Sequence, residues 1–177
     1  PARRSVFFRE YLRDVEATAE PGDGGCFNPG DVGRRGGDAA FHSVDRKKNV
    51  IRRSGENISA VEVESVLMQH PSIRQVAVAP APDPVRGDEV FACVVSEGAA
   101  PDAAARKQIA ADIVAWCLSR LAYFKAPGYV AFVSAVPLTS TQKIQRGALK
   151  ELVAATINSE TCVDTRPLKK RPVQKAG

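Results

Sequence analysis

From residue 45 onward, the apolar positions follow the periods of helices and strands in turn. Helical spacing predicts three helices, and shorter alternating or wholly apolar runs predict strands. The first predicted helix begins after Ser59 and ends at Pro71, the others span 104–121 and 146–155, and the predicted strands span 49–53, 73–79, 90–95 and 129–133. This order, β-α-β-β-α-β-α, predicts an α+β domain in which helices flank a small antiparallel or mixed sheet.

Cap and turn residues separate the predicted elements. Ser59 followed by Glu62 forms an S-x-x-E capping box. In such a box the Ser59 hydroxyl accepts from the backbone N–H of Glu62, and the Glu62 carboxylate accepts from the N–H of Ser59. The proline-rich run 80–84 predicts a rigid connector. The run 90–95 interrupts strict alternation with two adjacent valines, which predicts a strand buried on both faces.

The pattern divides the chain into three parts. Residues 1–44 carry glycine- and proline-rich turns and a short predicted strand at 41–44, which is too little apolar surface to close a core alone. We expect this part to be a β-rich remnant of a larger N-terminal domain. Residues 45–157 form the α+β unit. Residues 158–177, which include a Lys-Lys-Arg cluster, are predicted to be a mobile basic tail.

Composition then narrows the function classes. The 177 residues are 44% hydrophobic and 25% charged, as in an ordinary globular protein, and the net charge of +5 weakly favours phosphate-bearing partners. Nucleic acid is a poor candidate because the aromatic residues are few and do not interleave with basic ones. The sequence has no run of 18 apolar residues, so we expect no membrane-spanning segment. The four cysteines lack CxxC spacing, so we expect no metal site, no disulfide framework and a cytoplasmic protein.

Two basic segments flank the predicted unit. The first, 45–59, has five basic residues within nine positions, and the second, 137–146, places Lys143 in a polar loop before the last predicted helix. Composition alone favours a solvated surface for a basic run. Two such loops on either side of a compact unit indicate a module that binds an anion.

Three motifs in the chain resemble one known family. Residues 25–31, Gly-Cys-Phe-Asn-Pro-Gly-Asp, are similar to a G-W-F-x-T-G-D motif; residues 44–58 resemble a hinge and the loop that follows it; residues 137–146 resemble a C-terminal lysine motif. In this order they resemble the C-terminal part of the adenylate-forming enzymes: acyl-CoA synthetases, luciferases and peptide-synthetase adenylation domains. The similarity is greatest to bacterial fatty-acyl-CoA and crotonobetaine/carnitine-CoA ligases.

The resemblance implies a two-step reaction. In the family a large N-terminal domain holds ATP, Mg²⁺ and a carboxylic acid, and a small lid domain closes over it while acyl-adenylate and pyrophosphate form. The lid then rotates, the CoA thiolate attacks the adenylate, and AMP leaves. The chain is therefore expected to be the lid, with a stub of the large domain, of an ATP-dependent acid–CoA ligase.

The resemblance gives nucleotide-facing roles to three residues. Asp31 would accept from the ribose hydroxyls, which a carboxylate binds more strongly than a neutral acceptor does. Arg46 would contact the ribose or the phosphate. Lys143 would bridge the attacking carboxylate and the α-phosphate as charge builds in the transition state. Without the resemblance, Asp31 caps a turn and Lys143 is one exposed lysine among many.

Four further residues receive roles in the same way. Asp45 resembles the hinge about which the lid turns, and Gly55, Glu56 and Asn57 resemble the loop that lines the channel for the pantetheine arm of CoA. Without the resemblance, Asp45 pairs with a neighbouring cation at the surface, and Gly55 only supplies a positive φ.

The chain departs from the family pattern at several positions. Cys26 stands where the family has Trp, and Pro29, which follows Asn28, removes a backbone donor near the ribose contact. Gln142 stands where Gly is frequent, and we expect it to stiffen the lysine loop.

Larger family features have no counterpart in this sequence. These are the phosphate loop, the aromatic-Gly-x-Thr-Glu motif and the acyl pocket. We therefore expect a C-terminal fragment or a degraded relative, and expect that the isolated chain does not make acyl-CoA. Two alternatives stay open: a stand-alone module that binds CoA or nucleotide phosphates, and the lid of an adenylation domain that loads a carrier protein. The segments 56–57 and 123–125 favour CoA as the acceptor by resemblance.

Overall fold

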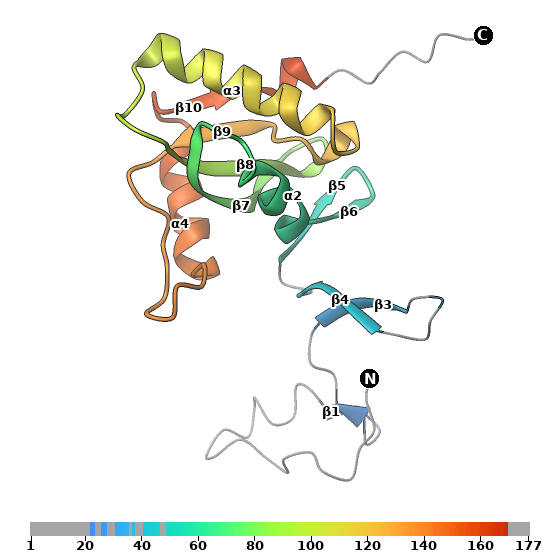
Figure 1. The fold of residues 1–177 in the computed structure, drawn as a ribbon. Helices are drawn as coiled ribbons and strands as arrows, with labels where there is room; N and C mark the ends of the chain where they lie inside the picture. The colour runs from blue at the N-terminus through green and yellow to red at the C-terminus, as the bar shows by residue number, and fades with distance from the viewer. Residues whose placement is uncertain are drawn as a thin grey trace, which may run out of the picture. The chain divides into compact units, whose positions relative to one another are not determined.

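The structure, a computed structural model, describes residues 22–23, 26–27, 31–35, 37, 41–46 and 49–169 (Figure 1). The chain divides into two compact units, Pro1–Lys48 and Asn49–Gly177. Each unit is described by itself.

The described residues of the first unit form two antiparallel pairs of strands. β1 (Gly22–Asp23) pairs with β2 (Cys26–Phe27), and β3 (Asp31–Arg35) pairs with β4 (Phe41–Arg46). The strand predicted at 41–44 is therefore present and continues for two more residues. Because β4 runs through Asp45 and Arg46, the division between the units falls after Lys48 rather than at residue 45.

The second unit is built on a mixed sheet. Its strands are β5 (Val50–Arg53), β6 (Glu56–Ser59), β7 (Ile73–Asp83), β8 (Gly87–Ser96), β9 (Tyr129–Phe132) and β10 (Cys162–Asp164). The strand order is β10-β9-β8-β5-β6, with β7 also paired to β8. β8 and β9 run parallel, and the other pairs are antiparallel. The predicted α+β fold with a mixed sheet is confirmed.

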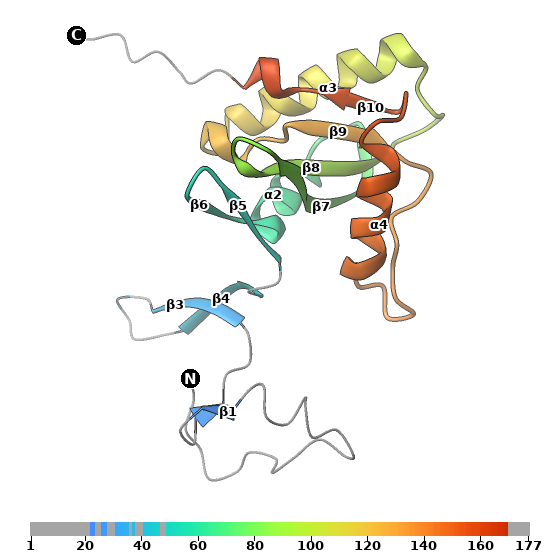
Figure 2. The same cartoon turned by 180° about the vertical axis from the view of Figure 1, so that it is seen from behind.

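Helices cover both faces of this sheet (Figures 1 and 2). α2 (Ala60–Leu67) and α3 (Ala103–Leu118) pack on one face, and α4 (Arg146–Thr156) packs on the other. Successive residues of a strand point to opposite faces. Val76 and Val78 accordingly join the core under α2 and α3, whereas Ala77 and Ala79 join the core under α4.

The predicted central strand is confirmed as β8. Its residues Val90, Ala92 and Val94 belong to one core, and Phe91 and Cys93 belong to the other. All five side chains are fully buried. A strand covered on both faces needs apolar residues at every position, which is why the run lacks alternation.

The cap of α2 is confirmed in its first half. The Ser59 hydroxyl accepts from the Glu62 N–H at 3.3 Å. The Glu62 carboxylate receives two hydrogen bonds from Lys125 Nζ, at 2.6 and 2.8 Å. The helix ends at Leu67, so Pro71 lies beyond it rather than at its last residue.

The predicted proline-rich connector at 80–84 is wrong, because β7 continues through Asp83. Pro80 pairs with Val90 and Pro82 with Asp88 across the β7–β8 hairpin. Both prolines share the parity of Val78, whose N–H points away from β8 toward a side chain. The missing N–H of each proline therefore falls on the outer edge of the strand, where proline does not break the ladder.

The prediction of a mobile tail from residue 158 is wrong for 158–169. β10 pairs with β9, and a 3₁₀ turn, η3 (Arg166–Leu168), follows it. Between them, Thr165 is fully buried and its hydroxyl donates to the Pro127 carbonyl at 2.9 Å. A three-residue strand of mixed polarity gives too short a pattern to be recognised from sequence.

Candidate functional site

The turn between β5 and β6 presents the predicted Gly55–Asn57 segment to solvent. Ser54 and Gly55 both have positive φ, 49° and 85°, the pattern of a two-residue type I′ hairpin turn. A Cβ on Gly55 would meet nothing within 4 Å, so glycine serves the turn conformation there rather than a close approach. Gly55, Glu56 and Asn57 are exposed. The conformational and the ligand-binding interpretations of Gly55 are compatible.

This hairpin borders a pocket of about 360 Å³. The Ser54 N–H donates to the Arg86 carbonyl at 2.9 Å, which fixes the turn against the β7–β8 connection. The lining residues are cationic and aromatic apart from a serine and one glutamate: Arg53, Ser54, Glu56, Arg86, Tyr123, Phe124, Arg166 and Lys169. Such a lining suits a ligand that carries both negative charge and a ring system.

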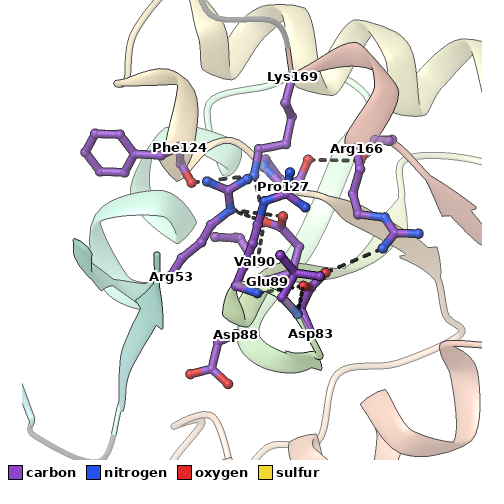
Figure 3. A network of polar contacts seen from close by, with 12 residues as sticks. Arg53, Asp83, Asp88, Glu89, Val90, Phe124, Pro127, Arg166 and Lys169 are labelled. Carbon is purple, nitrogen blue, oxygen red and sulfur yellow. Dashed lines mark hydrogen bonds and ion pairs between the residues drawn. The ribbon is translucent and has the colours of Figure 1, made fainter. Parts of the chain in front are cut away.

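A buried carboxylate, Glu89, binds two of the lining residues, Arg53 and Lys169, and we call these three residues the pocket floor (Figure 3). Glu89 has no exposed surface, and its two oxygens each accept from Arg53 Nε at 2.9 Å. Glu89 Oε1 also accepts from Lys169 Nζ at 2.7 Å and from the Val90 N–H at 2.9 Å. Figure 3 shows Arg53 and Lys169 reaching this carboxylate from different elements. A buried charge needs such partners, and removing one leaves the others uncompensated.

The Glu89 side chain leaves no room for a side chain at Gly128. A Cβ there would lie 2.4 Å from Glu89 Cγ and 2.5 Å from Glu89 Cδ. Burial lowers the pKa of Lys169 to about 8, although the hydrogen bond and the charge of Glu89 act in the opposite direction. The floor is therefore fixed by packing as well as by charge.

Two further arginines face this region with different constraints. Arg166 donates to Asp164 at 2.7 Å, lies 3.5 Å from Asp83, and stacks over the Tyr129 ring at 4.8 Å from its centroid. Arg86 is exposed at the connection between β7 and β8. Arg86 therefore presents a guanidinium to solvent, while Arg166 is held by acidic partners.

Lys143 lies in the loop between β9 and α4. Leu138 and Ile144 form an isolated antiparallel bridge across this loop. The Thr139 N–H donates to the Lys143 carbonyl at 2.8 Å, and the Lys143 N–H donates to Thr139 Oγ1 at 3.2 Å. The Lys143 side chain is exposed. Hydrogen bonds thus fix the backbone of the loop, while the Lys143 side chain is open to solvent.

Gln142 has a φ of 61°, the left-handed conformation that favours glycine. This gives a physical reason for the glycine that the family often carries at this position. A side chain here adds strain next to Lys143, in addition to the stiffening expected from sequence.

Three predicted site residues lie in the first unit. Asp31 and Arg46 are directly paired across β3 and β4, and Val32 pairs with Asp45. The two residues predicted to contact the nucleotide ribose or phosphate therefore occupy opposite positions of one hairpin. Pro29 and Asn28 lie outside the described residues.

The hairpin and the lysine loop lie on different sides of the second unit (Figures 1 and 2). In both views the β5–β6 hairpin projects from one side, whereas the loop before α4 projects from the other. The structure does not bring Lys143 together with Gly55, Glu56 and Asn57.

The buried network around Glu89 was not predicted from the sequence pattern. Arg53 belongs to the basic run that composition assigns to solvent, yet it is only 7% exposed. The available signal was Glu89 itself, a charged residue directly before the fully apolar run 90–95. Among the described residues, no group of three or more His, Cys, Asp and Glu is placed to hold a metal ion.

None of the helices described within residues 49–169 is long and apolar enough to cross a membrane.

Known proteins match the chain in sequence and structure. Residues 62–143 match the AMP-binding enzyme C-terminal domain family. The chain is 35% identical over 147 residues to a 2-succinylbenzoate–CoA ligase of Geobacillus kaustophilus, covering 82% of this chain and 29% of that protein. It is 34% identical over 155 residues to the long-chain-fatty-acid–CoA ligase FadD13 of Mycobacterium tuberculosis, covering 88% and 29%.

A solved structure gives the same assignment. The o-succinylbenzoate CoA synthetase of Bacillus subtilis, in complex with its acyl-adenylate intermediate, superposes with a TM-score of 0.70 at 27% identity, covering 80% of this chain and 28% of that one. The chain thus spans less than a third of the length of these relatives. It contains the C-terminal domain of the AMP-binding, adenylate-forming enzymes.

Proposed function

We propose that this chain provides the lid of an ATP-dependent acid–CoA ligase, which converts a carboxylate, ATP and CoA into acyl-CoA, AMP and pyrophosphate through an acyl-adenylate. The observation that carries the proposal is the exposed ammonium of Lys143 on an ordered loop, in a chain whose relatives are CoA ligases. The basic pocket at the other side of the unit supports the second step of the same reaction.

Lys143 acts in the first step. When a carboxylate attacks the α-phosphate of ATP, negative charge builds on the oxygens of both groups. An ammonium held between them stabilises this charge more in the transition state than in the ground state, which lowers the barrier. The bonds between Thr139 and Lys143 fix the backbone that carries the ammonium, so less conformational freedom is lost when the substrates bind.

The pocket next to the β5–β6 hairpin acts in the second step. Its cations suit the phosphates of CoA, and the rings of Tyr123 and Phe124 suit the adenine. Arg86 is the strongest phosphate ligand candidate because it is exposed, whereas Arg53 and Lys169 are bonded to Glu89. Gly55, Glu56 and Asn57 would then line the path of the pantetheine arm toward the adenylate.

The first unit contributes to nucleotide binding. Asp31 would accept from the ribose hydroxyls, and Arg46, opposite it on β4, would contact the ribose or phosphate. Asp45, next to Arg46, would be the hinge of the lid. Mg²⁺ would accompany ATP on the large domain of the family, since the described residues offer it no ligand cluster.

The test of the first step uses the complete enzyme that carries this domain. Lys143→Ala is expected to reduce pyrophosphate release with ATP and acid by roughly 10²–10³-fold. Thioester formation from supplied acyl-adenylate should be nearly unchanged. Lys150→Ala, at an exposed position on α4, is the matched control. Equal loss of both half-reactions in Lys143→Ala would reject the assignment.

The test of the second step uses the chain itself. Arg86→Gln is expected to weaken CoA binding about tenfold, as loss of one charged phosphate contact does. Lys107→Gln, an exposed position on α3, should leave CoA binding unchanged. If the chain binds CoA but the complete protein that carries it forms no acyl-CoA, the stand-alone module would be favoured. Transfer to a carrier protein in place of CoA would favour the carrier-loading lid.

A further inference from the structure

The outer edge of β7 is closed by side chains rather than by a strand. Among the described strands, β7 has its ladder with β8. On its other edge, the Val78 N–H donates to Glu64 Oε1 at 2.8 Å, and the Val78 carbonyl accepts from Arg146 Nη1 at 2.7 Å. Both backbone groups of Val78 are thus satisfied by one acidic and one basic side chain.

These two side chains also bind each other. Arg146 Nη1 lies 2.9 Å from Glu64 Oε1, and Arg146 Nη2 lies 3.1 Å from Glu64 Oε2. This is the two-point pairing that fixes a guanidinium in direction as well as in distance. The Glu64 side chain is 12% exposed and that of Arg146 is 27% exposed, so water screens the pair only in part.

The pair joins helices from opposite faces of the sheet. Glu64 belongs to α2, and Arg146 is the first residue of α4. α2 and α4 cover opposite faces of the sheet (Figures 1 and 2). Because Glu64 and Arg146 both bond to Val78, the pair reaches around the edge of β7. The start of α4 is therefore fixed to the rest of the unit at Arg146.

The start of α4 has no side-chain cap. Gln145, at the cap position, makes no such hydrogen bond, so the side-chain bonds at the start of α4 are those that Arg146 donates to Glu64 and to the Val78 carbonyl. Lys143 precedes Arg146 by three residues. The Gln145 N–H donates to the Pro137 carbonyl at 2.9 Å, which ties the two ends of the lysine loop together directly beside the anchor.

The loop also contains a strained residue. Gln142 keeps its positive φ only if the surrounding backbone holds it there. The bridge between Leu138 and Ile144 and the bonds of Thr139 hold the loop internally, and the side chains of Leu138 and Ile144 pack against the core under α4. Among the described residues, Arg146 is the nearest to Lys143 in sequence whose side chain is joined to the sheet by hydrogen bonds, which fix direction as apolar packing does not.

We propose that Glu64 and Arg146 are positioning residues for Lys143: they fix the base of the lysine loop to the edge of β7, so that the ammonium is held for the first half-reaction. The catalytic part of this inference rests on the proposed function of Lys143. The structural part, the attachment of the loop, stands without it.

The first measurement uses the 177-residue chain and amide hydrogen exchange. Arg146→Met and Glu64→Gln should each speed exchange of the loop N–H groups of Thr139, Gln142, Lys143 and Gln145 by about tenfold, because the charged bonds at the anchor are lost. Glu64→Gln keeps an oxygen that can accept from Val78. Exchange in β8 should stay slow, which identifies a folded variant. The control is Lys150→Met, which removes an exposed cation from the same helix.

The second measurement uses the complete enzyme. Arg146→Met and Glu64→Gln should lower kcat for pyrophosphate release about tenfold, with KM for ATP and thioester formation from supplied acyl-adenylate little changed. Arg146→Lys, which keeps the charge but not the two-point geometry, should recover part of kcat. A variant that only weakened the fold would lower both half-reactions together.

The outcomes separate the two proposals. Unchanged loop exchange in folded Arg146→Met and Glu64→Gln would overturn the attachment. Faster loop exchange with unchanged adenylation, in an enzyme that Lys143→Ala inactivates, would overturn the positioning role. Faster loop exchange in an enzyme that Lys143→Ala leaves active would instead reject the proposed function and leave the attachment standing.

Discussion

The pocket beside the β5–β6 hairpin and the loop that carries Lys143 both present positive charge, but they are built in opposite ways. The pocket floor consists of buried ions, Arg53, Glu89 and Lys169, joined by hydrogen bonds of 2.7–2.9 Å. The lysine loop carries an exposed ammonium on a backbone that includes a strained residue, Gln142. A floor of paired charges is stable and can bind only through its unpaired rim, whereas an exposed ammonium depends on a fixed backbone to be in the right place.

The largest predicted effect is a loss of stability when the paired charges of the pocket floor are broken. Glu89→Gln keeps the size of the side chain and removes the charge that Arg53 and Lys169 share. Breaking a buried pair in this way should lower the free energy of unfolding by about 3–5 kcal/mol. Urea denaturation of the chain measures it. A loss below about 1 kcal/mol, the value for a surface ion pair, would contradict the burial of these ions.

The fit of Gly128 against Glu89 gives the next effect. Gly128→Ala inserts a methyl group 2.4 Å from Glu89 Cγ. The Glu89 side chain cannot move away, because both of its oxygens are hydrogen-bonded. We expect a loss of about 1–3 kcal/mol in unfolding free energy.

Gly147 gives the matched control for that change. It lies in α4, and a Cβ there would meet nothing within 4 Å. Gly147→Ala should therefore stabilise the chain by roughly 0.5–1 kcal/mol, because alanine favours helix. Equal effects of the two substitutions would show that the contact with Glu89 relaxes at little cost.

The buried lysine predicts a dependence of stability on pH. The pKa of Lys169 is lowered from 10.5 to about 8, chiefly by burial. Between these values the unfolded chain holds a proton that the folded chain has released, so this group makes stability rise as pH increases through the window, by on the order of 1–3 kcal/mol. Lys169→Met should remove the rise and Lys150→Met should keep it. Identical pH slopes for all three proteins would contradict the lowered pKa.

The smallest effect is expected in the lysine loop. Gln142→Gly removes the strain of a positive φ and should raise the free energy of unfolding by about 0.5–1 kcal/mol. Ser140→Gly, at an exposed loop position without a positive φ, should lower it slightly. Thermal unfolding of the two variants compares them directly, and a gain for Ser140→Gly alone would contradict the assignment of strain to Gln142.

The sequence predicted the regular parts of the fold because their periods are long and clear. The helix predicted at 104–121 is α3, and the strand at 90–95 is the core of β8. The prolines of β7 misled the prediction, since proline ends most strands and is tolerated here only because its missing N–H faces the outer edge. Local pattern cannot report which strand will lie at an edge.

The candidate site shows the same limit. Lys143 and the 55–57 turn could be located because motifs and turn chemistry are local, and both are exposed in the structure. The partnership of Arg53, Glu89 and Lys169 joins residues 36 and 80 positions apart. A charged residue has the same local pattern whether it meets water or a distant opposite charge, so the buried network could not be predicted.

The short strand β10 changes where this protein can safely be cut. Truncation at residue 157, the end of the α+β unit that the sequence predicts, would strip the covering strand from β9 and remove the lysine that neutralises Glu89. The shortened chain would then display an unprotected ladder of backbone donors and acceptors, the arrangement by which β-proteins aggregate. Affinity tags, fluorescent labels and protease sites therefore belong beyond residue 169.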